Sequence, residues 1–478
     1  MNRPQIKHLL LTGLLLLTVT TQAEQNTSFS DLKLQDFQPP AHFDFATGNI
    51  DESAIGRQLF RKIRQRRILV EDPELNTWLQ SLVQRLTRNQ PAISKTIKAV
   101  IVNNPEINAH ALRGGIILVN SGLILSTETE SELAAVLAHE IAHVSQKHIN
   151  RLLANRKNSP WLTGLGILAG AAVASKNPQA GQAIITGASA ISAHNQLVYT
   201  QGFESEADRV GLRTLHAAGF NPAAMPYFLE KLERSELNLY GSLSKYLHSH
   251  PLTIERLSDT RNRANRLGRT QVRESADYLY AREKLRSLSH RNHTQSGQPL
   301  TGAVKRYQQA IQASQRGEHQ RVLQLLSNTS GQLAASLLVA QSLNAMKRYA
   351  EAERLLHQLT GRFARHEALI MTLAQTLHGK GQSAQALQWI DRIRISDKTS
   401  LEFIEAAQRI AQQSGKSQQA IFYNAQRKLL TADYQNAERI LQQTLRAQNI
   451  DSALRARLQR TLSKVRQAKQ EQHYLKQR

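Results

Sequence analysis

A repeat with a period of 34 residues constrains the fold of this chain more than any other feature. Three segments align in register: YAEAERLL (349–356), SAQALQWI (383–390) and SQQAIFYN (417–424). Each has alanine at its fourth position, and HQRVLQLL (319–326) and YQNAERIL (434–441) are degenerate copies at the two ends. A 34-residue period is that of tetratricopeptide repeats, in which one repeat is a pair of helices. Residues 302–478 are therefore expected to form an all-α solenoid.

Ahead of the repeats lies a polar segment, SHRNHTQSGQPLT (289–301), whose glycine and proline favour a linker. The part before it is expected to form a separate domain over 24–288. In that domain, TIKAVIVNN (96–104) is β-branched and predicts a strand, and INAHALRGGIILVNSG (107–122) predicts a hairpin that turns through Arg113-Gly114-Gly115. The predicted fold class is mainly α, with an α+β domain that has a small sheet, followed by the all-α solenoid.

Apolar residues at helical spacing predict further helices in the first domain. These helices cover 51–65 with Asp51 as N-cap, 75–88, 129–152, 181–217, 222–237 and 254–267. Between the third and the fourth, WLTGLGILAGAAVA (161–174) is apolar, but it is short for a membrane span and interrupted by glycine. The expectation there is a buried or re-entrant helical segment, with membrane contact as the alternative.

The N-terminus predicts export from the cytoplasm. Arg3 and Lys7 form a positive n-region, and an apolar run follows them. Thr21-Gln22-Ala23 then ends in the small-x-small pattern that a signal peptidase needs, so we expect a signal peptide over 1–23, cleaved after Ala23. An uncleaved anchor is the alternative, although the run is short for a span. The sequence has no cysteine, so disulfides do not stabilise it, and a bacterial periplasm suits an exported chain of this length.

The charge balance predicts an anionic partner. The formal net charge is +24 and the pI is about 10.4. Export argues against nucleic acid. A basic segment at the C-terminus carries Arg455, Arg457, Arg460, Lys464, Arg466 and Lys469. It is expected to bind acidic protein or lipopolysaccharide, with peripheral contact at the outer membrane; a solvated helix face without a partner is the alternative.

The stretch LAHEIAHV (137–144) places two histidines four residues apart on a predicted helix that begins at a capping box of Thr129 and Glu132. Residues four apart share one helix face, so His139 and His143 can offer ring nitrogens to one ion. Glu140 lies about 100° round the helix, within reach of a water on that ion. Two histidine ligands with a carboxylate base are the arrangement of HExxH zinc sites.

A third ligand is needed, because catalytic zinc sites use three protein ligands and leave one position open. Gln146 and Ile149 stand where a metzincin has its glycine and third histidine, so that class is excluded. Downstream, GFESEADRVG (202–211) offers Glu204 and Asp208 on one helix face. We expect Glu204 to complete a His₂Glu site for one Zn²⁺ per chain, and Asp208 to accept the free N–H of a ligating histidine.

Two polar neighbours of these motifs are left outside the predicted site. His148 lies five residues past His143 and points off the motif face of a continuous helix. Glu206 points away from Glu204 on its own helix. Both are expected to be surface residues.

HEIAH together with ESEAD resembles the M48 metallopeptidase family, and the repeats narrow the resemblance to periplasmic members that maintain β-barrel assembly at the outer membrane. Further matches are INAHALRGG (107–115), NPAAMPYFLEKL (221–232) and HPLTIERL (250–257). The resemblance covers nearly all of the mature chain and implies a gluzincin-type protease fold for 24–288. It carries the family's functional residues over to the zinc ligands His139, His143 and Glu204, the base Glu140, the histidine of a His-Pro pair at His250, and Arg256.

The role of His250 has more than one reading. As a fourth ligand it could displace the catalytic water and keep the enzyme silent, which is the regulatory role that the resemblance implies. Moved slightly, it could instead act in catalysis and stabilise the oxyanion, as could Arg256. A loop histidine without a role is the alternative, and His248 two residues earlier blurs the assignment.

The strand before the motif helix is expected to be the edge along which an extended substrate lies. It comprises Asn108, Ala109, His110 and Ala111. Family members often have an apolar residue where this chain has His110, and often proline where it has Arg113. These differences are expected to alter substrate preference and to leave the zinc site unchanged, and His110 is not expected to be a ligand.

The predicted function is that of a periplasmic zinc endopeptidase with a chaperone-like role in the assembly of outer-membrane β-barrel proteins. Its expected substrates are misfolded, unfolded or stalled outer-membrane proteins, and the resemblance implies that the repeat domain contacts the β-barrel assembly machinery. The alternative is a mainly non-proteolytic repeat-domain chaperone or adaptor with a latent zinc site.

Overall fold

The computed structural model describes residues 52–238 except 153–200, residues 245–289 except 269 and 271–274, and residues 302–477 except 329 and 330. The predicted signal peptide, nearly all of the predicted linker, the apolar stretch 161–174 and Asp51 lie outside these residues. Among the helices that are described, none combines the length and the apolarity that a membrane crossing requires.

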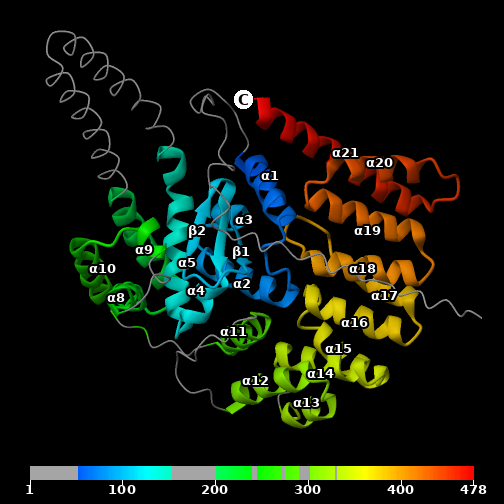
Figure 1. Cartoon of the computed structure of the whole chain (residues 1–478), viewed down its shortest axis with the longest axis horizontal. Coiled ribbons are helices and arrows are strands. Elements are labelled where there is room, and N and C mark those ends of the chain that lie inside the picture. Colours follow the sequence, from blue (N-terminus) through cyan, green and yellow to red (C-terminus); the bar gives the residue numbers. More distant parts are fainter. Residues whose placement is uncertain are drawn as a thin grey trace, which may run out of the picture.

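Within the described residues, one small sheet occupies the N-terminal domain (Figure 1). Its strands are β1 (Lys98–Val102), β2 (Ala109–Leu112) and β3 (Ile116–Asn120). The central strand β3 runs parallel to β1 and antiparallel to β2, which confirms the predicted strand and hairpin. The hairpin turn holds Gly114 at a φ of 72°, and a Cβ there would lie 2.3 Å from the Cα of Gly56, so glycine permits the approach of the preceding helix.

The motif helix α5 (Glu130–Ser145) contacts β2 and lies in the core. Its N-cap is Thr129, whose hydroxyl accepts a hydrogen bond from the backbone nitrogen of Glu132 at 3.1 Å, as predicted. The prediction of one helix up to residue 152 is wrong. The helix ends at Ser145, Lys147 has a φ of 54°, and helical structure resumes at 148–152. A residue with positive φ stops the ladder and turns the chain, which changes where the next side chains point.

The remaining helices of this domain enclose the sheet and α5. They are α1 (Glu52–Gln65), α2 (Pro73–Leu86), α3 (Pro91–Thr96), α4 (Ser121–Ser126), the helix at 201–217, α8 (Ala224–Asn238), α9 (Lys245–Ser249), α10 (Ile254–Leu267) and α11 (Ala276–Leu288). Except for α1, these helices share one core with α5, β1 and β3. The apolar residues of α1 form a second, smaller core with other side chains of β1 and β3. The small and apolar residues of α5 are buried along most of its length.

The C-terminal part is a stack of antiparallel helix pairs, as the 34-residue period predicts (Figure 1). The pairs are α12 (Gly302–Gln315) with α13 (His319–Leu325), α14 (Leu333–Ala345) with α15 (Tyr349–Thr360), α16 (Glu367–Gly379) with α17 (Ser383–Ile390), α18 (Leu401–Gln413) with α19 (Ser417–Leu430), and α20 (Tyr434–Leu445) with α21 (Ser452–Gln477). The in-register alanines Ala352, Ala386 and Ala420 are all buried between neighbouring helices. Alanine at these positions lets the helices pack closely.

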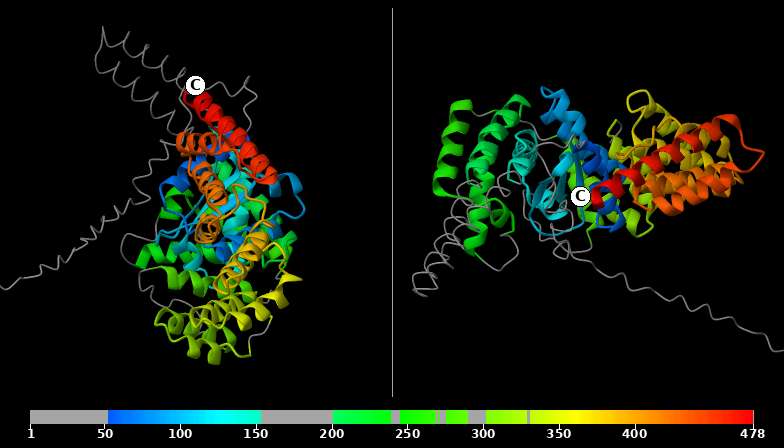
Figure 2. Two further views of the ribbon diagram at one scale, coloured as in Figure 1. Left: turned by 90° about the vertical axis from the view of Figure 1, so that its right-hand side faces the viewer. Right: turned by 90° about the horizontal axis from the view of Figure 1, so that it is seen from above.

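The repeat array curves along one side of the N-terminal domain and contacts it at both ends and in the middle (Figures 1 and 2). Its first helices contact α11, α16 contacts α2, and α19 and α21 contact α1. On α1, Arg61 pairs with Asp397 at 2.9 Å, and Gln58 donates to the carbonyl of Ala468 at 2.7 Å. Buried polar contacts of this kind fix the array against the domain.

Most of the basic C-terminal residues singled out in the sequence have partners inside the array. Arg457 pairs with Asp391 at 2.7 Å, and both Arg466 and Lys469 pair with Glu438. Arg455 donates to two backbone carbonyls at the end of α20. The observed contacts of these four side chains thus lie within the repeat array, which uses part of the charge that was expected to bind an acidic partner.

Candidate metal centre

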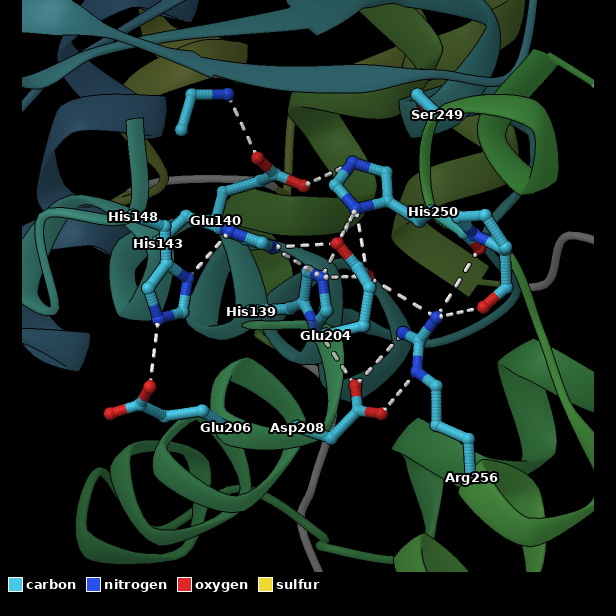
Figure 3. Close-up of polar contacts among 12 residues, drawn as sticks. His139, Glu140, His143, His148, Glu204, Glu206, Asp208, Ser249, His250 and Arg256 are labelled. Carbon is cyan, nitrogen blue, oxygen red and sulfur yellow. Dashed lines mark hydrogen bonds and ion pairs between the residues drawn. The ribbon is translucent and has the colours of Figure 1, made fainter. Parts of the chain in front are cut away.

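The two histidines of the HExxH motif face the middle of the N-terminal domain (Figure 3). His139 and His143 stand one turn apart on α5, and their Nε2 atoms lie 3.0 Å from each other. Only 2% of His139 is exposed. Two imidazoles that share one point in a protein interior are the beginning of a metal site, because a buried polar nitrogen needs a partner.

Glu204 reaches the same point from the helix at 201–217. A Cβ added to Gly211 of that helix would lie 3.1 Å from the backbone nitrogen of His139, so glycine permits this close crossing with α5. Glu204 Oε2 lies 3.3 Å from His139 Nε2, and Glu204 Oε1 lies 3.4 Å from His143 Nε2. The crossing of the two helices therefore brings the HExxH histidines together with the glutamate that the sequence placed far downstream.

His250 is the fourth member of this cluster and follows α9 directly. Its ring stacks on Tyr246, with ring centroids 4.7 Å apart and 29° between the planes. Its Nδ1 lies 3.3 Å from His139 Nε2 and 3.1 Å from each oxygen of Glu204. Nitrogen or oxygen atoms of His139, His143, Glu204 and His250 all lie within 4.8 Å of one another. The position of His250 is thus compatible with metal binding together with the other three residues.

Glu140 lies between this cluster and the edge of the sheet. Its Oε2 accepts a hydrogen bond from the backbone nitrogen of Ala111 at 2.8 Å, and its Oε1 lies 3.4 Å from His250 Nε2 (Figure 3). The residue is fully buried, and this burial raises the pKa of its carboxyl group above the usual range. A carboxylate whose proton affinity is raised in this way is suited to accept and return a proton.

A buried charged pair lies behind His139. Asp208 Oδ1 accepts from His139 Nδ1 at 2.9 Å, and the guanidinium of Arg256 on α10 makes two hydrogen bonds to the Asp208 carboxylate. Another nitrogen of Arg256 lies 3.2 Å from Glu204 Oε2, and it donates to the carbonyl of Pro251 at 2.7 Å. Arg256 therefore contacts both the Glu204 carboxylate and the Asp208 carboxylate behind His139. This placement favours a positioning role for Arg256 over the predicted role in stabilising the oxyanion.

The two motif histidines differ in charge when no metal is bound. Burial acts to lower the pKa of His139, but hydrogen bonds to Asp208 and Glu204 outweigh it and raise that pKa to about 10. The pKa of His143 is held well below its usual range, first by burial and then by the positive charge on His139. At neutral pH these shifts favour a protonated His139 and a neutral His143 in the metal-free protein.

The prediction that His148 is a surface residue is wrong, whereas the side chain of Glu206 remains 24% exposed. His148 is 3% exposed, and its Nδ1 lies 2.9 Å from Nδ1 of His143. Its Nε2 lies 3.3 Å from Glu206 Oε2, which also pairs with Arg151 at 2.8 Å. The break in the helix after Ser145 is the physical reason, because it turns His148 back toward α5. The contact could have been predicted only by ending the helix directly after the motif.

The predicted substrate strand lies beside Glu140. Asn108 precedes β2, and its backbone oxygen accepts from Asn120 at the end of β3. Ala109, His110 and Ala111 belong to β2, which has β3 as its strand partner in the described sheet. Burial, and then the proximity of His250, lowers the pKa of His110 to about 4, so its ring is neutral at ordinary pH. His110 is not a member of the ligand cluster.

The donor set fits a zinc ion. Imidazole nitrogens with one carboxylate are ligands that zinc prefers, whereas magnesium and calcium prefer sites built of oxygen alone. The far ring nitrogens of His139 and His143 are turned to Asp208 and His148, which leaves their Nε2 atoms for a metal.

Comparison with known families gives two matches. Residues 73–264, which include all four members of the cluster, match the model of peptidase family M48. Residues 343–410 match the model of a tetratricopeptide repeat.

Individual curated proteins are similar as well. The chain is 39% identical over 241 residues to a β-barrel assembly-enhancing protease of Yersinia pestis, a match that covers 50% of this chain and 49% of that protein. It is 35% identical over 288 residues to the protein of the same name from Escherichia coli K12, covering 58% and 59%. The metalloprotease LoiP of Escherichia coli K12 is 28% identical over 189 residues, covering 38% and 69%. The matched part therefore spans about half to three fifths of the first two relatives.

Proposed function

We propose, starting from the M48 peptidase domain and the tetratricopeptide repeats that this chain carries, that the protein is a zinc metalloendopeptidase. The observation that supports this most is the gathering of His139, His143, Glu204 and His250 at one buried point, with Glu140 beside it. In this proposal His139, His143 and Glu204 are the ligands of one Zn²⁺. A bound zinc ion would supply Lewis acidity toward a water molecule and toward the scissile carbonyl.

Glu140 is the residue that moves the proton. Its carboxylate takes a proton from the attacking water and later delivers it to the leaving amine. The raised pKa of this buried carboxyl suits both steps. In the structure, Glu140 accepts a hydrogen bond from the backbone N–H of Ala111 in β2. An extended substrate paired with β2 would therefore have its peptide bond next to this carboxylate.

Asn108, Ala109, His110 and Ala111 are accordingly proposed as the strand that binds substrate. Pairing through backbone hydrogen bonds binds extended chains with little regard to sequence. That mode suits an enzyme that acts on unfolded segments. His110 would then influence which side chains are accepted.

His250 is proposed to keep the resting site silent. Its Nδ1 lies near His139 Nε2 and both Glu204 oxygens. A fourth protein ligand there takes the position that a catalytic water needs. Because the same ring also faces Glu140, a small displacement of the segment after α9 would free both the open position and the base.

Asp208 and Arg256 are proposed to hold the ligands in place. Asp208 fixes the tautomer of His139, and Arg256 holds Asp208 and Glu204 together. Side chains that orient ligands in this way are required for metal affinity although they do not touch the metal.

The location and the partners are proposed on the sequence and on the relatives' names. A signal peptide over 1–23, cleaved after Ala23, would deliver a protease domain (24–288), a linker (289–301) and a repeat domain (302–478) to the periplasm. Two relatives are named for enhancing β-barrel assembly. Misfolded or stalled outer-membrane proteins are thus the proposed substrates, degraded by the protease while a chaperone-like activity assists assembly. The repeat domain is the proposed contact with the assembly machinery.

Replacement of Glu140 by glutamine tests the proposal. Glu140→Gln is expected to retain zinc and to lose about 10²–10⁴-fold in cleavage of an unfolded protein such as β-casein, because the amide cannot accept the proton. Zinc content is measured by elemental analysis and cleavage by peptide release. Glu233→Gln, on the exposed side of α8, is the matched control and should cleave like the wild type. Undiminished cleavage by Glu140→Gln would refute this mechanism.

The same assay separates the two readings of His250. His250→Ala should cleave faster than the wild type if this ring closes the resting site, because its removal opens a coordination position. An inactive variant with full zinc content would instead make His250 part of the catalytic machinery and would contradict the proposed latency.

A further inference from the structure

A second chain of polar side chains runs away from the metal centre behind His143 (Figure 3). His148 Nδ1 lies 2.9 Å from His143 Nδ1, and His148 Nε2 lies 3.3 Å from Glu206 Oε2. The same oxygen of Glu206 accepts from Arg151 at 2.8 Å. No step of the proposed mechanism uses these residues.

The position of His148 is fixed by its surroundings. Its ring stacks on Phe203, with centroids 4.6 Å apart and 16° between the planes. The guanidinium of Arg151 lies 4.7 Å from the centroid of the same phenyl ring. Phe203 directly precedes the ligand Glu204, so the helix that supplies the third ligand also holds His148. The ring cannot turn away from His143 without losing this stack and the contact with Glu206.

The direction of the hydrogen bonds follows from metal binding. A metal on His143 Nε2 requires that nitrogen to be unprotonated, so the remaining ring proton is on Nδ1. His143 Nδ1–H then donates to His148 Nδ1, which must carry a free lone pair. The proton of His148 is consequently on Nε2 and points at the carboxylate of Glu206, which Arg151 holds from the other side.

We propose that His148 is a positioning residue for the metal, which selects the tautomer of His143 and holds its Nε2 toward the centre, with Glu206 as its anchor. The inference rests on the proposed zinc site and adds two residues to its support. It gives His143 the kind of partner that Asp208 gives His139. An imidazole that is backed by a fixed acceptor binds a metal more tightly than a free one, because its orientation and proton are already set.

Two substitutions of His148 separate positioning from packing. His148→Phe keeps an aromatic ring that can stack on Phe203 but offers no acceptor to His143. His148→Asn loses the ring but carries an oxygen close to where Nδ1 was. We expect the zinc dissociation constant to rise about 10-fold in His148→Phe and to stay within about 3-fold of the wild type in His148→Asn. His216→Asn, an exposed histidine on the helix at 201–217, is the control and should not change it.

Zinc affinity is measured in the full-length protein by competition with a chromophoric chelator, and the ligand field by the visible absorption of the Co²⁺-substituted protein. A residue that only packs would lower the thermal stability of the metal-free protein and leave the Co²⁺ spectrum unchanged. His148→Phe is expected to alter that spectrum, and His148→Asn to restore it. Wild-type affinity together with a wild-type spectrum in His148→Phe would overturn the inference.

A milder variant covers the case in which His148→Phe does not fold. Glu206→Gln removes the charge that anchors His148 without changing the size of the side chain, and it should weaken zinc binding about 3-fold. An unchanged affinity there would equally overturn the inference. If the wild type itself bound no zinc, the proposed function would fail and this inference with it. Tight binding by the wild type and all variants would overturn the inference alone.

Discussion

Asp208 and His148 stand behind neighbouring histidines of the same helix, but they hold them with different chemistry. Behind His139 the acceptor is a carboxylate, which is itself paired with Arg256, and the side chains of this pair are only 5% and 3% exposed. Behind His143 the acceptor is a neutral imidazole, and the chain ends at Arg151, whose side chain is 47% exposed. The support behind His139 is charged and buried, and the support behind His143 begins with a neutral ring and ends in solvent.

The difference follows from where each support lies in the fold. Asp208 and Arg256 meet between α5, the helix at 201–217 and α10, where water is excluded and a charged hydrogen bond is strong. His148 and Arg151 follow the end of α5, where solvent screens the outer ion pair. We therefore expect the two supports to contribute unequally to metal binding, with the buried and charged support contributing more.

The largest effect is expected when the buried support is broken. Asp208→Asn should weaken zinc binding about 100-fold and lower the free energy of unfolding by about 3 kcal/mol, because it removes the charge that compensates buried Arg256. Chelator competition and urea unfolding measure the two quantities. The exposed pair on α10 offers a matched control, Asp259→Asn, with an expected change below about 0.5 kcal/mol. A loss no greater than that of His148→Phe would remove the distinction between the two supports.

An effect of intermediate size is expected on the number of protons that are released when zinc binds. Zinc binding near pH 7.5 should release about one proton, from His139 and not from His143, because only the first is protonated in the metal-free protein. Zinc affinity should therefore increase with pH up to about 10. In the metal-free protein, the contribution of His139 to stability should be complete below its unfolded pKa of about 6.5 and lost as the pH rises through about 10.

Isothermal titration in buffers with different ionisation enthalpies counts the released protons. Asp208→Asn should release fewer, because it removes a hydrogen bond that raises the pKa of His139, whereas His148→Phe should release about the same number as the wild type. A binding enthalpy that does not depend on the buffer would contradict the difference in charge between the two histidines.

The smallest effect is expected at the solvent end of the second support. Arg151→Gln should change stability by less than about 0.5 kcal/mol and zinc affinity by less than about 3-fold, because exposed ion pairs are screened by water. The measurements are those used for Asp208→Asn. If Arg151→Gln weakened zinc binding as much as His148→Phe, the exposed ion pair would contribute as much as the buried ring. Burial would then not explain the difference between the two supports.

Much of the fold and of the cluster could be predicted from local pattern. The 34-residue period placed the helix pairs of the repeat array, and the β-branched run and the Arg113–Gly115 turn placed the sheet. The spacing of His139 and His143, and of Glu204 and Asp208, put each pair on one helix face. These features depend on periods of a few residues, which are set by backbone geometry and are visible in a single sequence.

The errors came where the chain leaves a regular period. A continuous helix up to residue 152 would have turned His148 outward, and the break after Ser145 turned it inward. The basic C-terminal residues looked available for a partner, but Asp391 and Glu438 from other helices pair with several of them. Neither outcome could be read from spacing, because both depend on which elements come side by side.

The sequence by itself therefore determined the ligand types, the faces on which they lie and the repeat architecture, since each is a local property of helix and strand geometry. Only the tertiary structure decided that Glu204 lies between the two histidines, that His250 joins them, and that Arg256 faces Asp208 rather than the reacting groups. It also decided the contact of the repeats with α1. These arrangements come from helices crossing at positions such as Gly211, and a crossing is settled by packing between segments far apart in the chain.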